Sequence, residues 1–185
     1  MLIERAVAID PDNAASLGKL LLLARRLCER GCGFVTVTTS FVWDMHSDIN
    51  NAPVTTGMDY VGRPFDHAVS ALIEDIESRG LRDKIMLVCC GEMGRSPRIN
   101  AKGGRDHWGN AWSVCLGGAG IQPGAVIGKT NANGTAVTDR EVDHGHLFHT
   151  YLKAVGVDSK LEFNIGGRKF PIADPAKNPI TELLA

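Results

Sequence analysis

The sequence has few of the features that mark a disulfide-stabilised, membrane-embedded or nucleic-acid-binding protein. Its five cysteines are odd in number and form no Cys-x-x-Cys pair, which favours reduced thiols over a disulfide framework or a redox role. Apolar runs such as Leu20 to Ala24 are far shorter than the ~20 residues of a membrane-spanning helix. With 20 Lys and Arg against 21 Asp and Glu, there is no long basic run to neutralise a phosphate backbone. We therefore expect neither a membrane nor a nucleic-acid partner.

The first residues also lack an export signal, because no basic segment is followed by an apolar core and a small-residue cleavage site. The chain as written is therefore expected to be cytoplasmic. Its hydrophobic content of 44% and charged content of 22% are typical of a soluble globular protein. A chain of 185 residues is long enough for one core, so we predict a single domain over residues 1–185.

The hydrophobic pattern alternates between helical and strand-like segments. Apolar residues at helical spacing predict helices at 11–30, 60–79 and 143–155. Short β-branched or apolar runs predict strands at 33–39, 84–90 and 111–116, with another near 168–172 in a tail that wraps the surface. This order predicts an α/β fold with a mostly parallel sheet flanked by helices. In such sheets the functional loops follow the carboxyl ends of the strands.

Two of the predicted strands are followed by candidate ligands. Asp44 and His46 lie two residues apart, so an extended backbone places both side chains on the same side, where they could share a cation. The alternative is that Asp44 caps a turn and His46 is an ordinary surface residue. After the next strand, Glu92 is placed to bind a metal and Arg95 to bind an anion. The alternative there is a structural salt bridge of Glu92 with Arg95 or Arg98.

Asp106 and His107 form the third candidate cluster. Adjacent residues of an extended segment point to opposite sides, so His107 is predicted as a metal ligand and Asp106 as a residue that orients a ligand or binds a second metal. An exposed polar pair is the alternative. Carboxylate and imidazole together favour one or two Zn²⁺, Mn²⁺ or Fe²⁺ ions over Ca²⁺ or Mg²⁺. The histidines near 144–149 are discounted, because Asp143 suits the N-cap of the predicted helix.

Five segments together resemble the bacterial family called domain of unknown function 1501. They are LLLARRLCERGCGFVTV, WDMHSD, FDHAVSALIEDIESRGL, GEMGRSPRIN and GGRDHWGNAWSVCLGGAGI. That family is similar to sulfatases and alkaline phosphatases, which implies an alkaline-phosphatase-like fold with metals at the strand ends. The resemblance implies metal binding by Asp44, His46, Glu92 and His107, with Arg95 and Asp106 as catalytic residues. Met93 departs from the superfamily pattern where an imidazole is usual, which puts a second metal in doubt.

The same resemblance implies a hydrolase of small anionic sulfate or phosphate esters. No hydroxyl of this sequence matches the superfamily's nucleophile, so we expect the C-terminal part of a longer, exportable protein, an incomplete copy of the fold. The alternative is a non-catalytic remnant or partner-binding domain that keeps one metal site. An incomplete fold is also expected to self-associate through an uncovered sheet surface.

Overall fold

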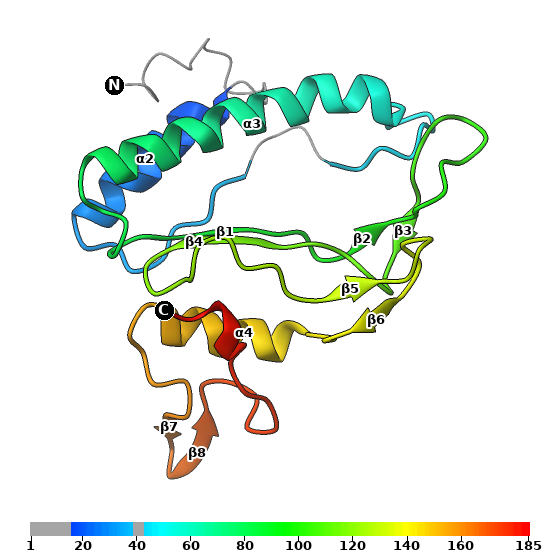
Figure 1. Ribbon diagram of the computed structural model, residues 1–185. Helices are drawn as coiled ribbons and strands as arrows, with labels where there is room; N and C mark the ends of the chain where they lie inside the picture. The colour runs from blue at the N-terminus through cyan, green and yellow to red at the C-terminus, as the bar shows by residue number, and fades with distance from the viewer. Residues whose placement is uncertain (1–15, 39–42) are drawn as a thin grey trace. The chain divides into compact units, whose positions relative to one another are not determined.

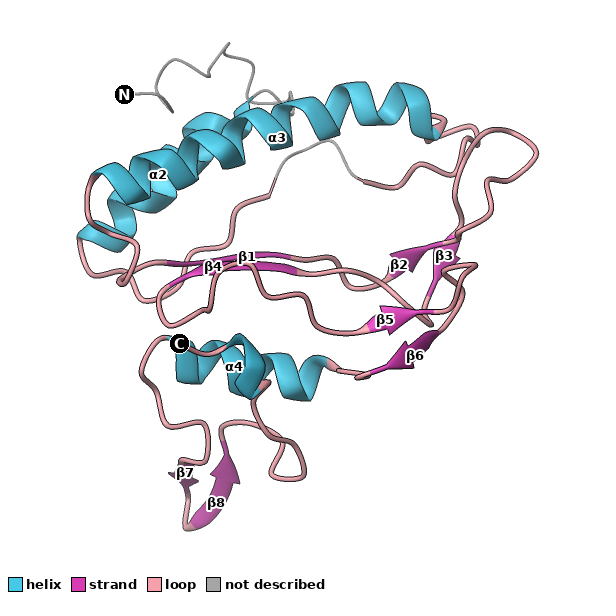
Figure 2. Cartoon of the chain, viewed as in Figure 1, coloured by secondary structure: helices cyan, strands magenta, loops and turns pink. Residues whose placement is uncertain are grey.

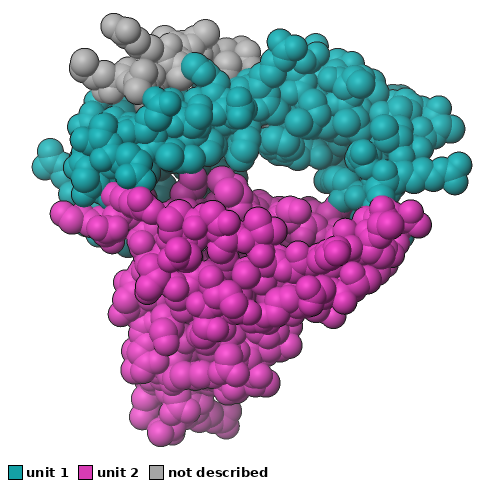
Figure 3. Space-filling model, viewed as in Figure 1, with its two compact units in different colours: residues 1–81, 95–108 teal, residues 82–94, 109–185 magenta. Residues whose placement is uncertain are grey.

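A computed structural model describes residues 16–38 and 43–185 of the chain (Figure 1). It consists of two compact units, residues 1–81 with 95–108 and residues 82–94 with 109–185 (Figure 3). The single domain predicted over residues 1–185 stays a prediction. Within the described part of the chain, no helix combines the length and the apolar character needed to cross a membrane.

Two helices that pack side by side build the first unit (Figure 1). Helix α2 (Leu17–Glu29) buries Gly18, Leu21, Leu22 and Arg25, which recur at helical spacing. Helix α3 (Val54–Ser78) buries Gly57, Val61, Ala68, Ala71, Leu72, Asp75 and Ile76. The helices predicted at 11–30 and 60–79 are confirmed over the described residues, but α3 begins six residues earlier than expected.

A buried ion pair joins these two helices. Arg25 of α2 is 4% exposed and Asp75 of α3 is 5% exposed, and Arg25 Nε lies 2.9 Å from Asp75 Oδ2. Arg79 Nε donates to the other carboxylate oxygen, Oδ1, at 2.7 Å, while Arg25 Nη1 donates to Glu29. Burial acts to raise the pKa of Asp75, but the hydrogen bond from Arg79 and the charges of both arginines outweigh it and lower the pKa. Asp75 is therefore a buried carboxylate that depends on its partners.

The second unit contains an antiparallel strand pair, β1 (Met86–Cys89) and β4 (Cys115–Gly118) (Figure 2). Met86 lies opposite Gly118, and Cys89 lies opposite Cys115. A Cβ at Gly118, whose φ is +77°, would overlap the carbonyl oxygen of Ile85. Glycine is therefore required where the end of β4 passes this close to the chain preceding β1.

The predicted fold class is wrong. The sheets of the described chain are two-stranded, and the registers of β1–β4, β5–β6 and β7–β8 are antiparallel, so there is no mostly parallel sheet of the alkaline-phosphatase type. A continuous apolar run indicates a covered strand, but it carries no information about the direction of its partner. Parallel neighbours need a crossover connection, usually a helix. Residues 90–114, between β1 and β4, contain no helix.

Of the other predicted strands, one is absent over its described residues and one is shifted along the chain. Residues 33–38 form no strand, although Val35 and Val37 favour one locally; Thr39, the last residue of that prediction, lies outside the described residues. The strand predicted at 111–116 lies instead at 115–118, and the stretch between the strands predicted at 84–90 and 111–116 contains β2 (Gly94–Arg95) and β3 (His107–Trp108). Two further hairpins are formed by β5 (Lys129–Thr130) with β6 (Val137–Asp139) and by β7 (Glu162–Ile165) with β8 (Arg168–Pro171).

Helix α4 (His144–Ala154) confirms the third predicted helix and anchors the C-terminal tail. His149, fully buried, contacts Ser159 Oγ through Nδ1 and the carbonyl oxygen of Asp174 through Nε2, both at 2.7 Å. The buried Thr150 Oγ1 accepts from the backbone N–H of Ile180, which is 1% exposed. The tail then ends in the short 3₁₀ helix η2 (Thr181–Leu183). Burial of these polar groups is tolerated because each is hydrogen-bonded.

The Arg140–Glu182 ion pair gives an acid-dependent prediction. Two hydrogen bonds from Arg140, at 2.7 and 3.0 Å, are the main reason that the pKa of Glu182 falls from 4.5 to about 2. A carboxylate with a lowered pKa stabilises the fold above its unfolded pKa, and this contribution disappears as the pH falls to about 2. Glu182→Gln should therefore lower the melting temperature slightly at pH 6 and leave it unchanged at pH 2. Melting curves across this range test it, and Arg140→Gln should reproduce the loss at pH 6.

Candidate metal centre

The first part of the site is the extended segment that leads into α3. The side chain of Met45 is 6% exposed and packs with Val61, and a Cβ at Gly57 would come within 2.7 Å of its Sδ. Since successive side chains of an extended segment alternate, burial of Met45 leaves Asp44 and His46 on the opposite side. Asp44 Oδ1 and His46 Nε2 are 2.8 Å apart, which confirms the predicted same-side arrangement.

The loop within residues 95–108, the second stretch of the first unit, lies against this extended segment. The backbone N–H of Arg105 donates to the carbonyl oxygen of Met45 at 2.8 Å, and Ser47 Oγ donates to that of Lys102 at 2.6 Å. Gly104 lies so close to the carbonyl of His46 that a Cβ would overlap it. These contacts between residues about 55 positions apart carry His107, in β3, to Asp44 and His46.

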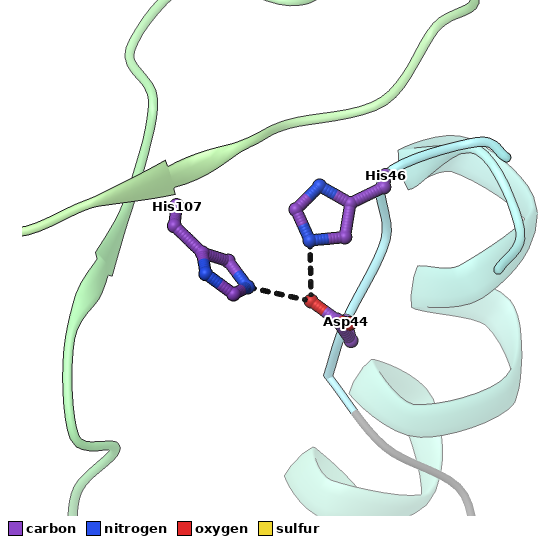
Figure 4. A group of neighbouring side chains, drawn as sticks. All are labelled: Asp44, His46 and His107. Carbon is purple, nitrogen blue, oxygen red and sulfur yellow. Dashed lines mark hydrogen bonds and ion pairs between the residues drawn. The ribbon is translucent and has the colours of Figure 1, made fainter.

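Three side chains meet at Asp44 Oδ1 (Figure 4). His46 Nε2 is 2.8 Å and His107 Nε2 is 3.3 Å from this oxygen, and the two imidazole rings are 4.7 Å apart between centroids. One ligand atom from each residue lies within 4.8 Å of the others. The side chains are reachable from solvent, with exposures of 31% for Asp44, 20% for His46 and 53% for His107.

Arg95, at the end of β2, is the basic residue of the site. Its Nη1 donates to Asp44 Oδ1 and lies 3.4 Å from His46 Nε2. Burial acts to raise the pKa of Asp44, but hydrogen bonds from Arg95 and His107 outweigh it, so the pKa lies below its usual range. Asp44 is therefore held as a carboxylate. The alternative partner considered for Arg95 was Glu92, and the structure pairs Arg95 with Asp44.

Asp106 lies behind His46, on the ring nitrogen that faces away from Asp44. Its Oδ1 is 3.3 Å from His46 Nδ1 and accepts from Asn100 Nδ2 at 3.1 Å. Asn100 is a site residue that the sequence reasoning missed. Its side chain also donates to the His46 carbonyl and accepts from the Gly104 backbone, and the hydrogen bonds of Asn100 and His46 lower the pKa of Asp106. An asparagine ahead of two adjacent glycines was the available turn signal.

The remaining candidates lie in the second unit. Glu92 and Met93 follow β1 there, and the group of three converging ligand atoms does not include Glu92. Its role as a ligand stays a prediction. At the start of α4, Asp143 forms the N-cap with a capping box to His146, as predicted, and its Oδ2 accepts from Lys177 Nζ at 2.6 Å. The contact with Lys177 is the main reason that the pKa of Asp143 lies far below its usual range.

The donor set of Asp44, His46 and His107 fits a divalent transition metal. Ligand atoms bound at 2.0–2.2 Å in a tetrahedral site lie about 3.3–3.6 Å from one another. The separation of 3.3 Å between Asp44 and His107 already matches, and the 2.8 Å between Asp44 and His46 is a hydrogen-bond distance that would have to open slightly. Asp106 behind His46 supplies the carboxylate–histidine arrangement that commonly supports metal-binding imidazoles.

Comparison with known proteins assigns the chain to a family, but that family has no described activity. No curated protein and no solved structure matches the sequence. Residues 3–184 match the model of a family described as "Protein of unknown function (DUF1501)". That match covers nearly the whole chain, and its boundaries include all of the site residues described above. The chain therefore belongs to the DUF1501 family of proteins of unknown function.

Proposed function

We propose that the chain binds a divalent metal cation through Asp44, His46 and His107 and hydrolyses small sulfate or phosphate esters. The observation that carries this proposal is the convergence of a carboxylate and two imidazoles from segments about 60 residues apart. Carboxylate and imidazole donors favour Zn²⁺, Mn²⁺ or Fe²⁺ over Ca²⁺ or Mg²⁺. The proposed substrate is a small molecule with one anionic ester group.

The surrounding residues suit this chemistry. A bound divalent cation would polarise the ester oxygens and lower the pKa of a coordinated water. Asp106 Oδ1 lies 3.3 Å from His46 Nδ1; with the proton on Nδ1, this carboxylate would accept it and leave Nε2 for a cation, which makes Asp106 a positioning residue. Arg95 presents a planar set of N–H donors that matches sulfate and phosphate oxygens.

A relation of the family to the sulfatases and alkaline phosphatases is part of the proposal. It rests on the motifs around Asp44, Glu92 and His107, which would correspond to the C-terminal, metal-binding part of those hydrolases. The fold gives no support, because the strand pairs of this chain are antiparallel. Of the hydroxyls close to the site, Ser96 Oγ donates to the carbonyl of Arg98 and accepts from the N–H of Asp106, while Ser47 Oγ donates to Lys102. Both are held by the loop and neither is placed as a nucleophile.

Metal content and thermal stability test the metal site. We expect purified protein to bind about one Zn²⁺, Mn²⁺ or Fe²⁺ ion per chain by elemental analysis and to melt at a lower temperature after chelation, because a ligand that binds only the folded state stabilises it. Asp44→Ala and His107→Ala should each weaken Zn²⁺ binding by about tenfold or more in calorimetric titrations.

His144→Ala is the matched control, because His144 lies at the start of α4 and its ring contacts that of Trp112 in a tilted arrangement, with the centroids 5.3 Å apart. This variant should bind Zn²⁺ like the wild type. A protein that binds none of the three metals and melts unchanged after chelation would exclude the proposed site. Hydrolysis of aryl sulfate and aryl phosphate by the metal-loaded protein, lost in His107→Ala, then tests the reaction itself.

The second candidate function is a domain that holds one metal and binds a partner without catalysis. The engagement of Ser47 and Ser96 in loop hydrogen bonds favours it, because neither hydroxyl is free to attack a substrate. A metal-loaded protein that turns over neither ester would select this alternative.

A further inference from the structure

Arg95 contacts two of the three ligand atoms of the candidate metal site. Its Nη1 donates to Asp44 Oδ1 and lies 3.4 Å from His46 Nε2. These residues supply two of the three converging ligand atoms. One positive charge, fixed on a side chain, therefore neutralises the carboxylate that a metal would use.

His46 and Arg95 both contact Asp44 Oδ1, but they differ in how they can make room for a metal at this oxygen. An imidazole can carry its proton on either ring nitrogen, and His46 Nδ1 faces Asp106 at 3.3 Å, where a proton can be held. With its proton on Nδ1, His46 can offer the lone pair of Nε2 to a cation after only a slight opening of its 2.8 Å contact with Asp44. Arginine stays protonated and has no lone pair to offer. Arg95 can only move away from Asp44.

The position of Arg95 in the chain limits how far it can go. Strand β2 pairs with β3, and the adjacent Ser96 N–H donates to the Asp106 carbonyl at 2.8 Å, so the backbone of Arg95 is held beside the site. The side chain is 27% exposed. A guanidinium released from Asp44 would thus remain next to the cation, with its donors available to an anion.

We propose that a divalent cation displaces Arg95 from Asp44 and that the displaced guanidinium then binds the anionic group of the substrate. Metal and anion would in this way bind cooperatively, with Arg95 exchanging one anionic partner for another. This inference rests on the proposed metal site and adds a coupling between its two ligands. By linkage, the factor by which an anion tightens metal binding equals the factor by which the metal tightens anion binding.

Calorimetric titration with Zn²⁺, with and without inorganic sulfate, tests the coupling in the wild-type protein first. Sulfate should tighten Zn²⁺ binding by about fivefold or more, a usual size for coupling between two sites. In Arg95→Gln, Zn²⁺ should bind about tenfold more tightly than in the wild type without sulfate, because the competing charge is gone, and sulfate should have no further effect. Arg95→Lys keeps the charge, so its Zn²⁺ affinity should stay close to that of the wild type.

Arg98→Gln is the matched control, since it removes an exposed arginine of the same loop and changes the net charge equally. It should titrate like the wild type. Wild-type protein that binds Zn²⁺ without any effect of sulfate, or an Arg95→Gln variant that binds Zn²⁺ no more tightly, would overturn the exchange while leaving the metal site in place. Wild-type protein that binds no Zn²⁺, Mn²⁺ or Fe²⁺ would overturn both proposals. Circular dichroism of each variant shows that a changed affinity does not come from unfolding.

Discussion

Replacing Asp75 by alanine is expected to destabilise the protein by about 3 kcal/mol, because it removes the carboxylate of α3 that pairs with the buried cation Arg25. Arg25 is 4% exposed and cannot regain water without separating α2 from α3. Removal of one member of a buried pair costs about 3–5 kcal/mol, and Glu29, which also contacts Arg25, favours the lower end of this range. Urea denaturation followed by circular dichroism measures the change.

Asp59→Ala provides the control on the same helix. Asp59 pairs with Arg63 one turn away at 3.0 Å, but the two side chains are 62% and 81% exposed. An exposed pair of this kind contributes between 0 and about 1 kcal/mol. If both substitutions lowered the free energy of unfolding equally, burial of the Arg25–Asp75 pair would add nothing to its contribution to stability.

Replacing Gly104 by alanine is expected to disrupt the candidate metal centre. A Cβ at this position overlaps the carbonyl of His46, and backbone atoms cannot swing aside as the end of a flexible side chain could. The segment from Met45 to Ser47 would have to move away from the loop, which separates His46 from Asp106 and His107. We expect a loss of about 1–3 kcal/mol in stability and a tenfold or greater loss of Zn²⁺ affinity.

Gly109→Ala makes the same chemical change two residues beyond His107, where an added Cβ meets nothing within 4 Å. Its melting temperature and Zn²⁺ affinity should stay close to those of the wild type. An unchanged Zn²⁺ affinity in Gly104→Ala would mean that contact between the loop and the segment of Asp44 and His46 does not build the site. Both variants can be compared in a single calorimetric series.

Local sequence pattern predicted the helices well, for a physical reason that lies within each segment. Leu21, Leu22 and Arg25 fall on one face of α2 whatever the rest of the chain does, because helical spacing sets the face. The N-cap role of Asp143 is similarly local and was predicted from the residue type at the start of α4. Strand direction has no such local origin. The apolar run of β1 is compatible with parallel or antiparallel partners, and only its pairing with β4 decides between them.

The candidate site likewise has some features that the local sequence predicted and others that only long-range contacts decide. Alternation along an extended segment was enough to place Asp44 and His46 on one side, and the pair formed by Asp106 and His107 was recognisable from residue types. Their meeting depends on hydrogen bonds between the loop and the segment, such as that from Ser47 to Lys102, and on the absence of a side chain at Gly104. Contacts of this kind join residues far apart in the sequence, and the periodicity of the sequence does not reveal them.

By itself, the sequence determined where the helices lie, apart from the start of α3, which residue types could hold a metal, and that Asp44 and His46 face the same way. The tertiary structure decided the antiparallel pairing of β1 with β4, the burial of Arg25 against Asp75 and the choice of Asp44 as the partner of Arg95. The physical reason is the separation in sequence over which each kind of interaction acts. Backbone geometry acts between neighbours in the chain, whereas burial and charge pairing depend on which distant segments the folded chain brings together.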